Sequence, residues 1–407
     1  MTITTPPIPP FESHARTVVR AVRTAFADAI SSLELDPNEP QAISRELGVN
    51  KNLAWKISKV IQADDPALGL QQMPGAAGIK IFLRALKAAG IEASLAEAVR
   101  ESVGAYEELI KVHAGDRATL EMMGSTLSPS GDPQRDEHHR KLLFQGASYL
   151  WGVQARVSLK IGIVGPSSRP HMLDFASLNA LVDFRRLRSD VSWVMASRHA
   201  NFDDGSNMPG SPTEPIDRRY TAADEAPLMA DFCSKPLPDL RRRAKKHGST
   251  FELVEGPVGK TGAITCVFGM IQRNIPAYGD SEDDYGRHLA TCDTPSQLLV
   301  LDLLIHKDFT FAIPPEPALC SLAAVPSPPP LADRKYLPLH DRLQDLGMSP
   351  VPAVTPEVPR YARMLQQMYE RTGWKPEEFH GFRMKIPYPA FPTSVELRYR
   401  LPIRSQA

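Results

Sequence analysis

The spacing of apolar residues changes along this chain, and the change limits the folds it can adopt. Near the N-terminus, five apolar residues recur at the three- or four-residue spacing of one helix face: Val18, Val22, Phe26, Ile30 and Leu33. In residues 157–163 every second residue is apolar, as in a strand with one buried face. The residues between them are predicted to face water: Arg156, Ser158, Lys160 and Gly162. The chain is therefore expected to be an α+β protein, with helices first and strands later.

The first part of the chain reads as helices throughout. Residues 12–125 are predicted to form an all-helical region, in which Ser94 and Glu97 have the spacing of a capping box at one helix start. Residues 1–11 are rich in Pro and Thr and are expected to be a disordered lead-in. Residues 126–137 are polar and rich in turn formers, so a linker is predicted there.

The second part of the chain is predicted to contain strands. Residues 138–407 are expected to form one α+β domain or two subdomains, and residues 395–401 show clear strand alternation. Residues 297–311 are apolar enough for either a buried strand or a buried helix. Twelve of the 38 Pro lie in residues 314–359, which predicts long Pro-rich loops because Pro has no N–H for ladders or helices. This region is expected to act as a sensor or a protein-interaction domain.

The most specific local pattern lies in residues 40–61. Gly48 can adopt a positive φ at a tight turn, Ser44 is small enough for close approach, and Asn50 can cap a following helix. Apolar residues stand on both sides of the turn: Ile43, Leu47, Val49, Ala54 and Ile57. This pattern resembles the helix-turn-helix of bacterial transcription regulators, although Ala54 stands where those motifs usually have Val or Ile. The resemblance covers residues 40–61 only.

That resemblance implies that the second helix of the pair contacts double-stranded DNA. Lys side chains can neutralise phosphates or reach guanine, and Asn can pair with adenine. The predicted contact residues are Arg45, Asn50, Lys51, Asn52, Lys56 and Lys59. Trp55 is expected to pack inside, and the alternative is that it lies against the sugar-phosphate edge of the duplex. Residues 1–65 contain seven Lys and Arg against eight Asp and Glu, so the basic character is confined to one helix face.

Composition indicates where the protein is located and which partners it can have. The chain has 47 basic and 47 acidic residues, and no apolar run reaches the ~18 residues of a membrane span. Four Cys without a Cys-x-x-Cys pair fit buried free thiols and a cytoplasmic location. No membrane partner, cofactor or metal site is predicted. A homodimer is expected through residues 79–112, together with an unknown effector or protein partner.

Two other functions remain open from the sequence. The protein is an enzyme if a deep pocket in residues 138–407 gathers His306, Asp308 or His199 with other polar groups. It is a scaffold if the helix pair contacts protein, and then an apolar patch should replace the basic face. The charge run at residues 241–247 is expected to be a flexible solvated loop, although contact with DNA phosphates or an acidic partner is also open.

Overall fold

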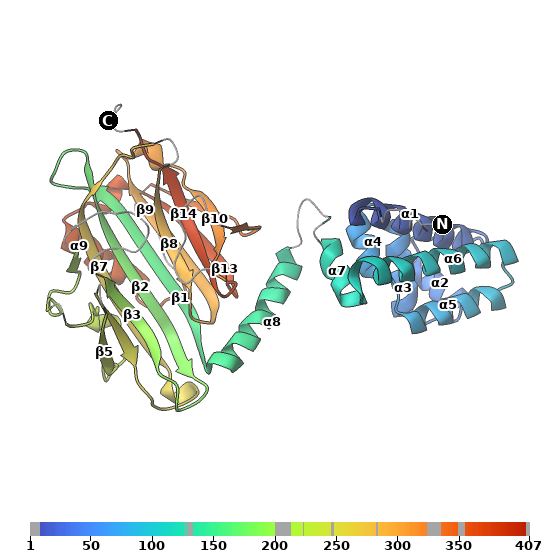
Figure 1. The fold of residues 1–407 in the computed structure, drawn as a ribbon, viewed down its shortest axis with the longest axis horizontal. Helices are drawn as coiled ribbons and strands as arrows, with labels where there is room; N and C mark the ends of the chain where they lie inside the picture. Colours follow the sequence, from blue (N-terminus) through green and yellow to red (C-terminus); the bar gives the residue numbers. More distant parts are fainter. Residues whose placement is uncertain are drawn as a thin grey trace, which may run out of the picture. The chain divides into compact units, whose positions relative to one another are not determined.

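The chain contains both helices and sheets, which confirms the predicted α+β class. The computed structural model describes residues 9–125, 127, 133–199, 213–222, 224–245, 248–281, 284–323, 335–348 and 355–403. The chain divides into two compact units, residues 1–132 and residues 133–407. We call them the helical unit and the sheet unit (Figure 1). Residues 1–8 of the predicted lead-in lie outside the described residues.

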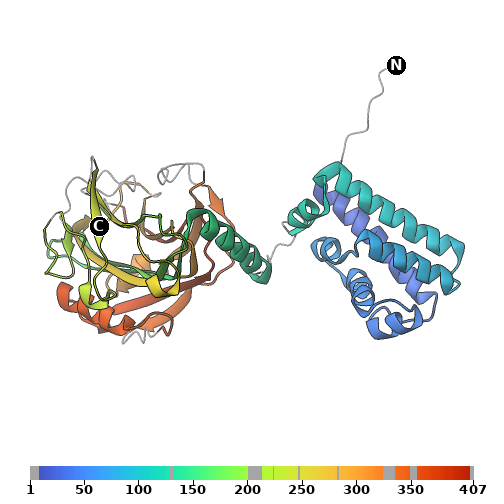
Figure 2. The same ribbon diagram turned by 90° about the horizontal axis from the view of Figure 1, so that it is seen from below.

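Every element described in the helical unit is a helix (Figure 2). They are α1 Phe11–Ser31, α2 Pro40–Glu46, α3 Lys51–Gln62, α4 Pro66–Gln72, α5 Ala76–Ala88, α6 Ala93–Leu109, the π-helical turn Ile110–Ala114 and α7 Arg117–Ser125. The apolar stripe predicted in α1 is buried, and Phe26 packs edge-on against Phe82 of α5 with ring centroids 5.2 Å apart. These contacts give the unit its own core, which also includes α3 and α6.

The predicted capping box is wrong. Helix α6 begins at Ala93 with Glu92 as its N-cap residue, so Ser94 lies inside the first turn rather than at the cap. The Ser94 hydroxyl donates to Glu92 Oε2 at 3.2 Å, and Glu97 pairs with Arg100.

The predicted linker at 126–137 is also partly wrong. Helix α8 runs over Pro133–Trp151, so residues 133–137 are helical. Proline suits the first position of a helix because the N–H that it lacks would have no partner there. Residues 126 and 128–132 lie outside the described residues.

The described residues of the sheet unit form α8, α9 (Tyr361–Thr372) and three sheets. Its strands are β1 Val153–Pro166, β2 Met172–Arg186, β3 Trp193–His199, β4 Thr213–Pro215, β5 Leu240–Lys245, β6 Gly248–Leu253, β7 Ile264–Pro276, β8 Tyr285–Cys292, β9 Ser296–His306, β10 Glu316–Ser321, β11 Tyr336–Leu337, β12 Gln344–Met348, β13 Phe379–Pro387 and β14 Thr393–Arg400. The strand orders are β12-β13-β9-β1-β2-β7-β4, β11-β10-β14-β8 and β3-β6-β5. Strands β1 and β9 pair in parallel at the centre of the largest sheet.

Both faces of the largest sheet are covered, so the predicted wet face of β1 is wrong. One face packs against α9, and the other packs against the four-stranded sheet. Ser158 and Gly162 are therefore buried. A Cβ at Gly162 would lie 2.9 Å from the ring of His288 on β8, so glycine is required by the close packing of the two sheets.

Two other predictions in this unit are resolved by strand pairing. Residues 297–311 gave a choice between helix and strand, and β9 occupies most of them as a strand. The prediction of a loop at residues 241–247 is wrong for residues 241–245, the part that the structure describes. These residues belong to β5, which pairs with β6, and Arg243 forms an ion pair with Glu252 at 2.7 Å. The predicted Pro-rich loops at 314–359 include strands β10, β11 and β12, and residues 324–334 and 349–354 lie outside the described residues.

A buried charged group ties α9 to the largest sheet. Arg383 on β13 donates two hydrogen bonds to Asp302 on β9, at 2.8 and 2.6 Å. The Tyr361 hydroxyl on α9 donates to the same carboxylate, and the Arg383 guanidinium lies 5.2 Å from the Tyr361 ring centroid. Asp302 is 1% exposed and Arg383 is 4% exposed, so each charge depends on the other for its stabilisation.

Candidate functional site

The turn between α2 and α3 holds the two helices in a fixed arrangement. Gly48 has φ +62°, the left-handed conformation expected at the turn. The Ser44 hydroxyl donates to the Val49 carbonyl at 2.7 Å, which ties the end of α2 to the start of the next segment. The five apolar positions predicted to flank the turn are all buried: Ile43, Leu47, Val49, Ala54 and Ile57.

The start of α3 is capped as predicted. Asn50 is the N-cap residue, and its side-chain oxygen accepts from the Asn52 backbone N–H at 2.8 Å. The Asn50 oxygen is therefore engaged in holding the helix, and its amide N–H₂ can donate to an external partner.

The outward face of α3 brings together most of the predicted contact residues. Lys51, Asn52 and Lys59 are exposed, and Lys56 is half-buried at the edge of the face. No Asp or Glu occurs in α3. The face is therefore locally basic and is available to a partner.

Trp55 lies at the centre of this face, so the prediction that it packs inside is wrong. Its side chain is 45% exposed, and the Lys59 ammonium lies 5.8 Å from its ring centroid. Trp55 precedes the buried Ile57 by two residues, a rotation of about 200° about the helix axis, which directs the indole outward. The outward position of Trp55 could therefore have been predicted from the sequence, because Ile57 was expected to be buried.

Arg45, the sixth predicted contact residue, lies on α2 and is also exposed. Its Nε lies 3.3 Å from Glu46 Oε1. Any anion that approached Arg45 would have to compete with that carboxylate.

Charge in the helical unit is strongly segregated. Residues 9–125 contain 13 Lys and Arg and 15 Asp and Glu, yet α3 and α5 together hold six of the cations and none of the acids. The cations of α5 are Lys80, Arg84 and Lys87, all exposed. The two helices approach at Gly78, where a Cβ would lie 3.2 Å from Leu53 of α3. The α5 cations were not among the predicted contact residues, although their spacing along an acid-free helix could have indicated them.

The sheet unit contains an open polar pocket of about 420 Å³. It is lined by Pro166, Ser168, Asp174, Glu214, Arg273, Asn274, Thr372 and Trp374. The Trp374 indole packs over Gly165, where a Cβ would lie 2.4 Å from the ring. Glycine at that position is what allows the indole to form one wall.

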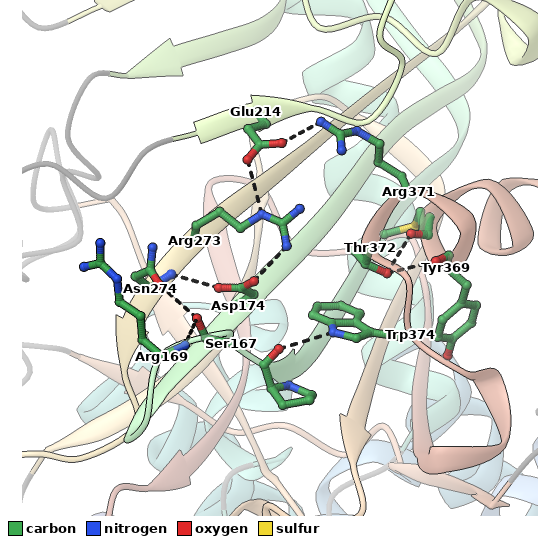
Figure 3. Close-up of polar contacts among 12 residues, drawn as sticks. Ser167, Arg169, Asp174, Glu214, Arg273, Asn274, Tyr369, Arg371, Thr372 and Trp374 are labelled. Atoms are coloured by element: carbon green, nitrogen blue, oxygen red, sulfur yellow. Dashed lines mark hydrogen bonds and ion pairs between the residues drawn. The ribbon is translucent and has the colours of Figure 1, made fainter.

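The charged residues of this pocket form a chain of ion pairs. Arg273 lies between two carboxylates, with Nη1 2.7 Å from Asp174 and Nε 3.3 Å from Glu214. Arg371 reaches Glu214 from α9 at 2.5 Å, and the Asn274 backbone N–H donates to Asp174 at 2.9 Å (Figure 3). Each carboxylate is thus already bonded to a guanidinium. Such a site is suited to binding a polar molecule, and less suited to proton transfer.

Two of the residues expected to mark an enzyme site, His306 and Asp308, do not line this pocket. His306 is buried against the rings of Phe309 and Phe379, with Asp308 Oδ2 3.4 Å and Glu378 Oε2 3.6 Å from its ring nitrogens. Asp308 follows the end of β9 in a turn rather than sharing a strand face with His306. Among the described residues, no group of three or more His, Cys, Asp and Glu side chains is arranged to hold a metal ion. The four Cys are free and buried.

No protein-family model, no curated protein and no solved structure matches this chain. Within the part of the chain that the structure describes, no helix has both the length and the apolar character that crossing a bilayer requires.

Proposed function

We propose that this protein is a sequence-specific DNA-binding transcriptional regulator that presents α3 to the major groove. The observation that carries the proposal is the exposed face of α3, where three lysines project from a capped helix without a single acid. Helix-turn-helix proteins place the N-terminal part of their second helix against base edges. Lys51 and Asn52 lie in the first turn of α3, the position that this docking requires.

The residues of the face have distinct roles in this proposal. Lys56 and Lys59 neutralise phosphates, and Lys51 reaches either a phosphate or guanine. Asn52 pairs with adenine, while Asn50 mainly positions the helix through its cap. Trp55 supplies an apolar surface of the kind that contacts a thymine methyl group.

Selection of bound fragments from genomic DNA by the full chain tests the proposal. At low salt we expect enrichment of one short sequence, arranged as an inverted repeat if two copies bind together. Retention of no DNA at low salt contradicts the proposal and favours an enzyme or a scaffold.

Salt dependence gives a second, quantitative expectation. Three lysines per α3 should release about three counterions, so log K should fall with log salt at a slope of about −3 per bound copy. The slope is measured by fluorescence anisotropy on an enriched duplex. A slope near zero would show that binding does not use these phosphate contacts.

The pocket in the sheet unit favours a sensor role for that unit. Its size suits a small polar effector, and its paired carboxylates argue against an acid–base enzyme. The scaffold alternative receives less support, because the α3 face carries one apolar side chain among three lysines rather than an apolar patch.

A further inference from the structure

Helix α8 has one anchored side and one exposed apolar side. Its inner side packs on the sheet unit through the buried residues Phe144, Ala147 and Ser148, and Arg140 bonds to Asp341 at 2.6 Å. Its outer side carries four large exposed apolar residues: Leu142, Leu143, Tyr149 and Leu150. Tyr149 is 79% exposed and Leu150 is 69% exposed, which is unusual for neighbouring residues of this size.

The four side chains are arranged symmetrically about one glycine. Leu142 and Leu143 stand four and three residues before Gly146, and Tyr149 and Leu150 stand three and four residues after it. No atom of the described structure lies within 4 Å of a Cβ built on Gly146. If a second α8 crossed the first in the antiparallel direction at Gly146, the two leucines before the glycine in one copy would lie against Tyr149 and Leu150 of the other copy. A surface of this kind is self-complementary, as a two-fold interface must be.

Charge and area both favour a second copy of this chain as the occupant. Residues 142–155 contain no charged residue, so pairing two copies there removes no charge from water. The four exposed side chains offer on the order of 400 Å² of apolar surface per copy. Stable interfaces bury about 800 Å² per partner, with an apolar centre and a polar rim. The patch is large enough for that centre, and the exposed His138, His139 and Gln145 can supply part of the rim.

We propose that α8 is a dimerisation helix, which pairs with α8 of a second copy in an antiparallel crossing centred on Gly146. This contact replaces residues 79–112 as the expected dimer interface. It does not depend on DNA binding, so the two proposals can fail separately.

Sedimentation equilibrium of the full chain, from about 1 to about 100 μM, tests the proposal. We expect wild-type protein to approach twice its monomer mass of 44.9 kDa as its concentration rises. The Gly146→Arg variant should remain at the monomer mass, because the arginine occupies open space in its own chain but blocks the crossing. Circular dichroism checks that the variant is folded.

Gly104→Arg is the matched control. Gly104 is an exposed glycine within α6, also without any described atom within 4 Å of a built Cβ, and it lies in residues 79–112. This variant should dimerise like wild type. Loss of the dimer in Gly104→Arg, or a folded Gly146→Arg variant that still dimerises, overturns the proposal. A wild-type protein that stays monomeric at every concentration also overturns the proposal. If the Gly146→Arg variant of such a monomer melts at a lower temperature than wild type, the patch is covered by another part of its own chain.

Discussion

Replacing Asp302 with alanine is expected to lower the free energy of unfolding of the sheet unit by about 3–5 kcal/mol. The substitution leaves the Arg383 guanidinium, 4% exposed, without the carboxylate that accepts its two hydrogen bonds. It also removes the acceptor of the Tyr361 hydroxyl, through which α9 is held to the sheet. The expected cost combines the loss of these charge-assisted hydrogen bonds with the desolvation of a guanidinium that stays buried.

Urea unfolding, followed by far-ultraviolet circular dichroism, measures this loss. Asp190→Ala is the control, since Arg188 and Asp190 form an ion pair at 3.9 Å with side chains 53% and 81% exposed. Removing that exposed pair should change the stability by less than about 1 kcal/mol. Equal small effects from both substitutions would show that the buried pair contributes little.

Stability should also fall steeply in mild acid because of His288. Burial, assisted by the positive charge of Lys160, lowers the pKa of His288 from 6.5 to about 3. Between these two values the unfolded chain binds a proton that the folded chain does not, so stability decreases as the pH falls. The decrease is about 1.4 kcal/mol per pH unit, and about 5 kcal/mol over the whole window. Above pH 6.5 His288 is neutral in both the folded and the unfolded chain, so it no longer makes the stability depend on pH.

Comparison with a His288→Gln variant isolates this effect. Carboxylates titrate in both proteins, so the difference between their urea midpoints across pH 6 to 4 reports His288 alone. We expect wild type to lose about 2–3 kcal/mol more than the variant over that interval. Parallel curves would mean that His288 is protonated as easily in the folded protein as in the unfolded chain.

Local patterns predicted the parts of the fold that depend on neighbouring residues. The helical period placed α1, glycine at 48 gave the turn, and Asn50 gave the cap of α3. Strand alternation located β1 and β14. In each of these cases the physical cause lies within about ten residues of the element.

Features that depend on distant segments could not be read in the same way. The face of β1 predicted to be wet is covered by the sheet that contains β8, more than 100 residues later. The chain of ion pairs at the pocket joins Asp174, Glu214, Arg273 and Arg371, which come from β2, β4, β7 and α9. Only the pairing of these strands and the docking of α9 bring the four side chains together, and none of them has a distinctive local motif.

The most direct test of the α3 interface is a gel-shift titration of the full chain carrying Lys51→Glu and Lys56→Glu. With an enriched duplex at low salt, we predict about a 100-fold or greater loss of affinity, because two cations that face the duplex are replaced by anions that its phosphates repel. Circular dichroism should be unchanged, since Lys51 is exposed and Lys56 lies at the edge of the face. Arg16→Glu with Arg20→Glu makes the same charge change on the exposed side of α1 and should retain most of the affinity. A lysine double variant that binds like wild type would contradict the assignment of α3 as the DNA-binding helix.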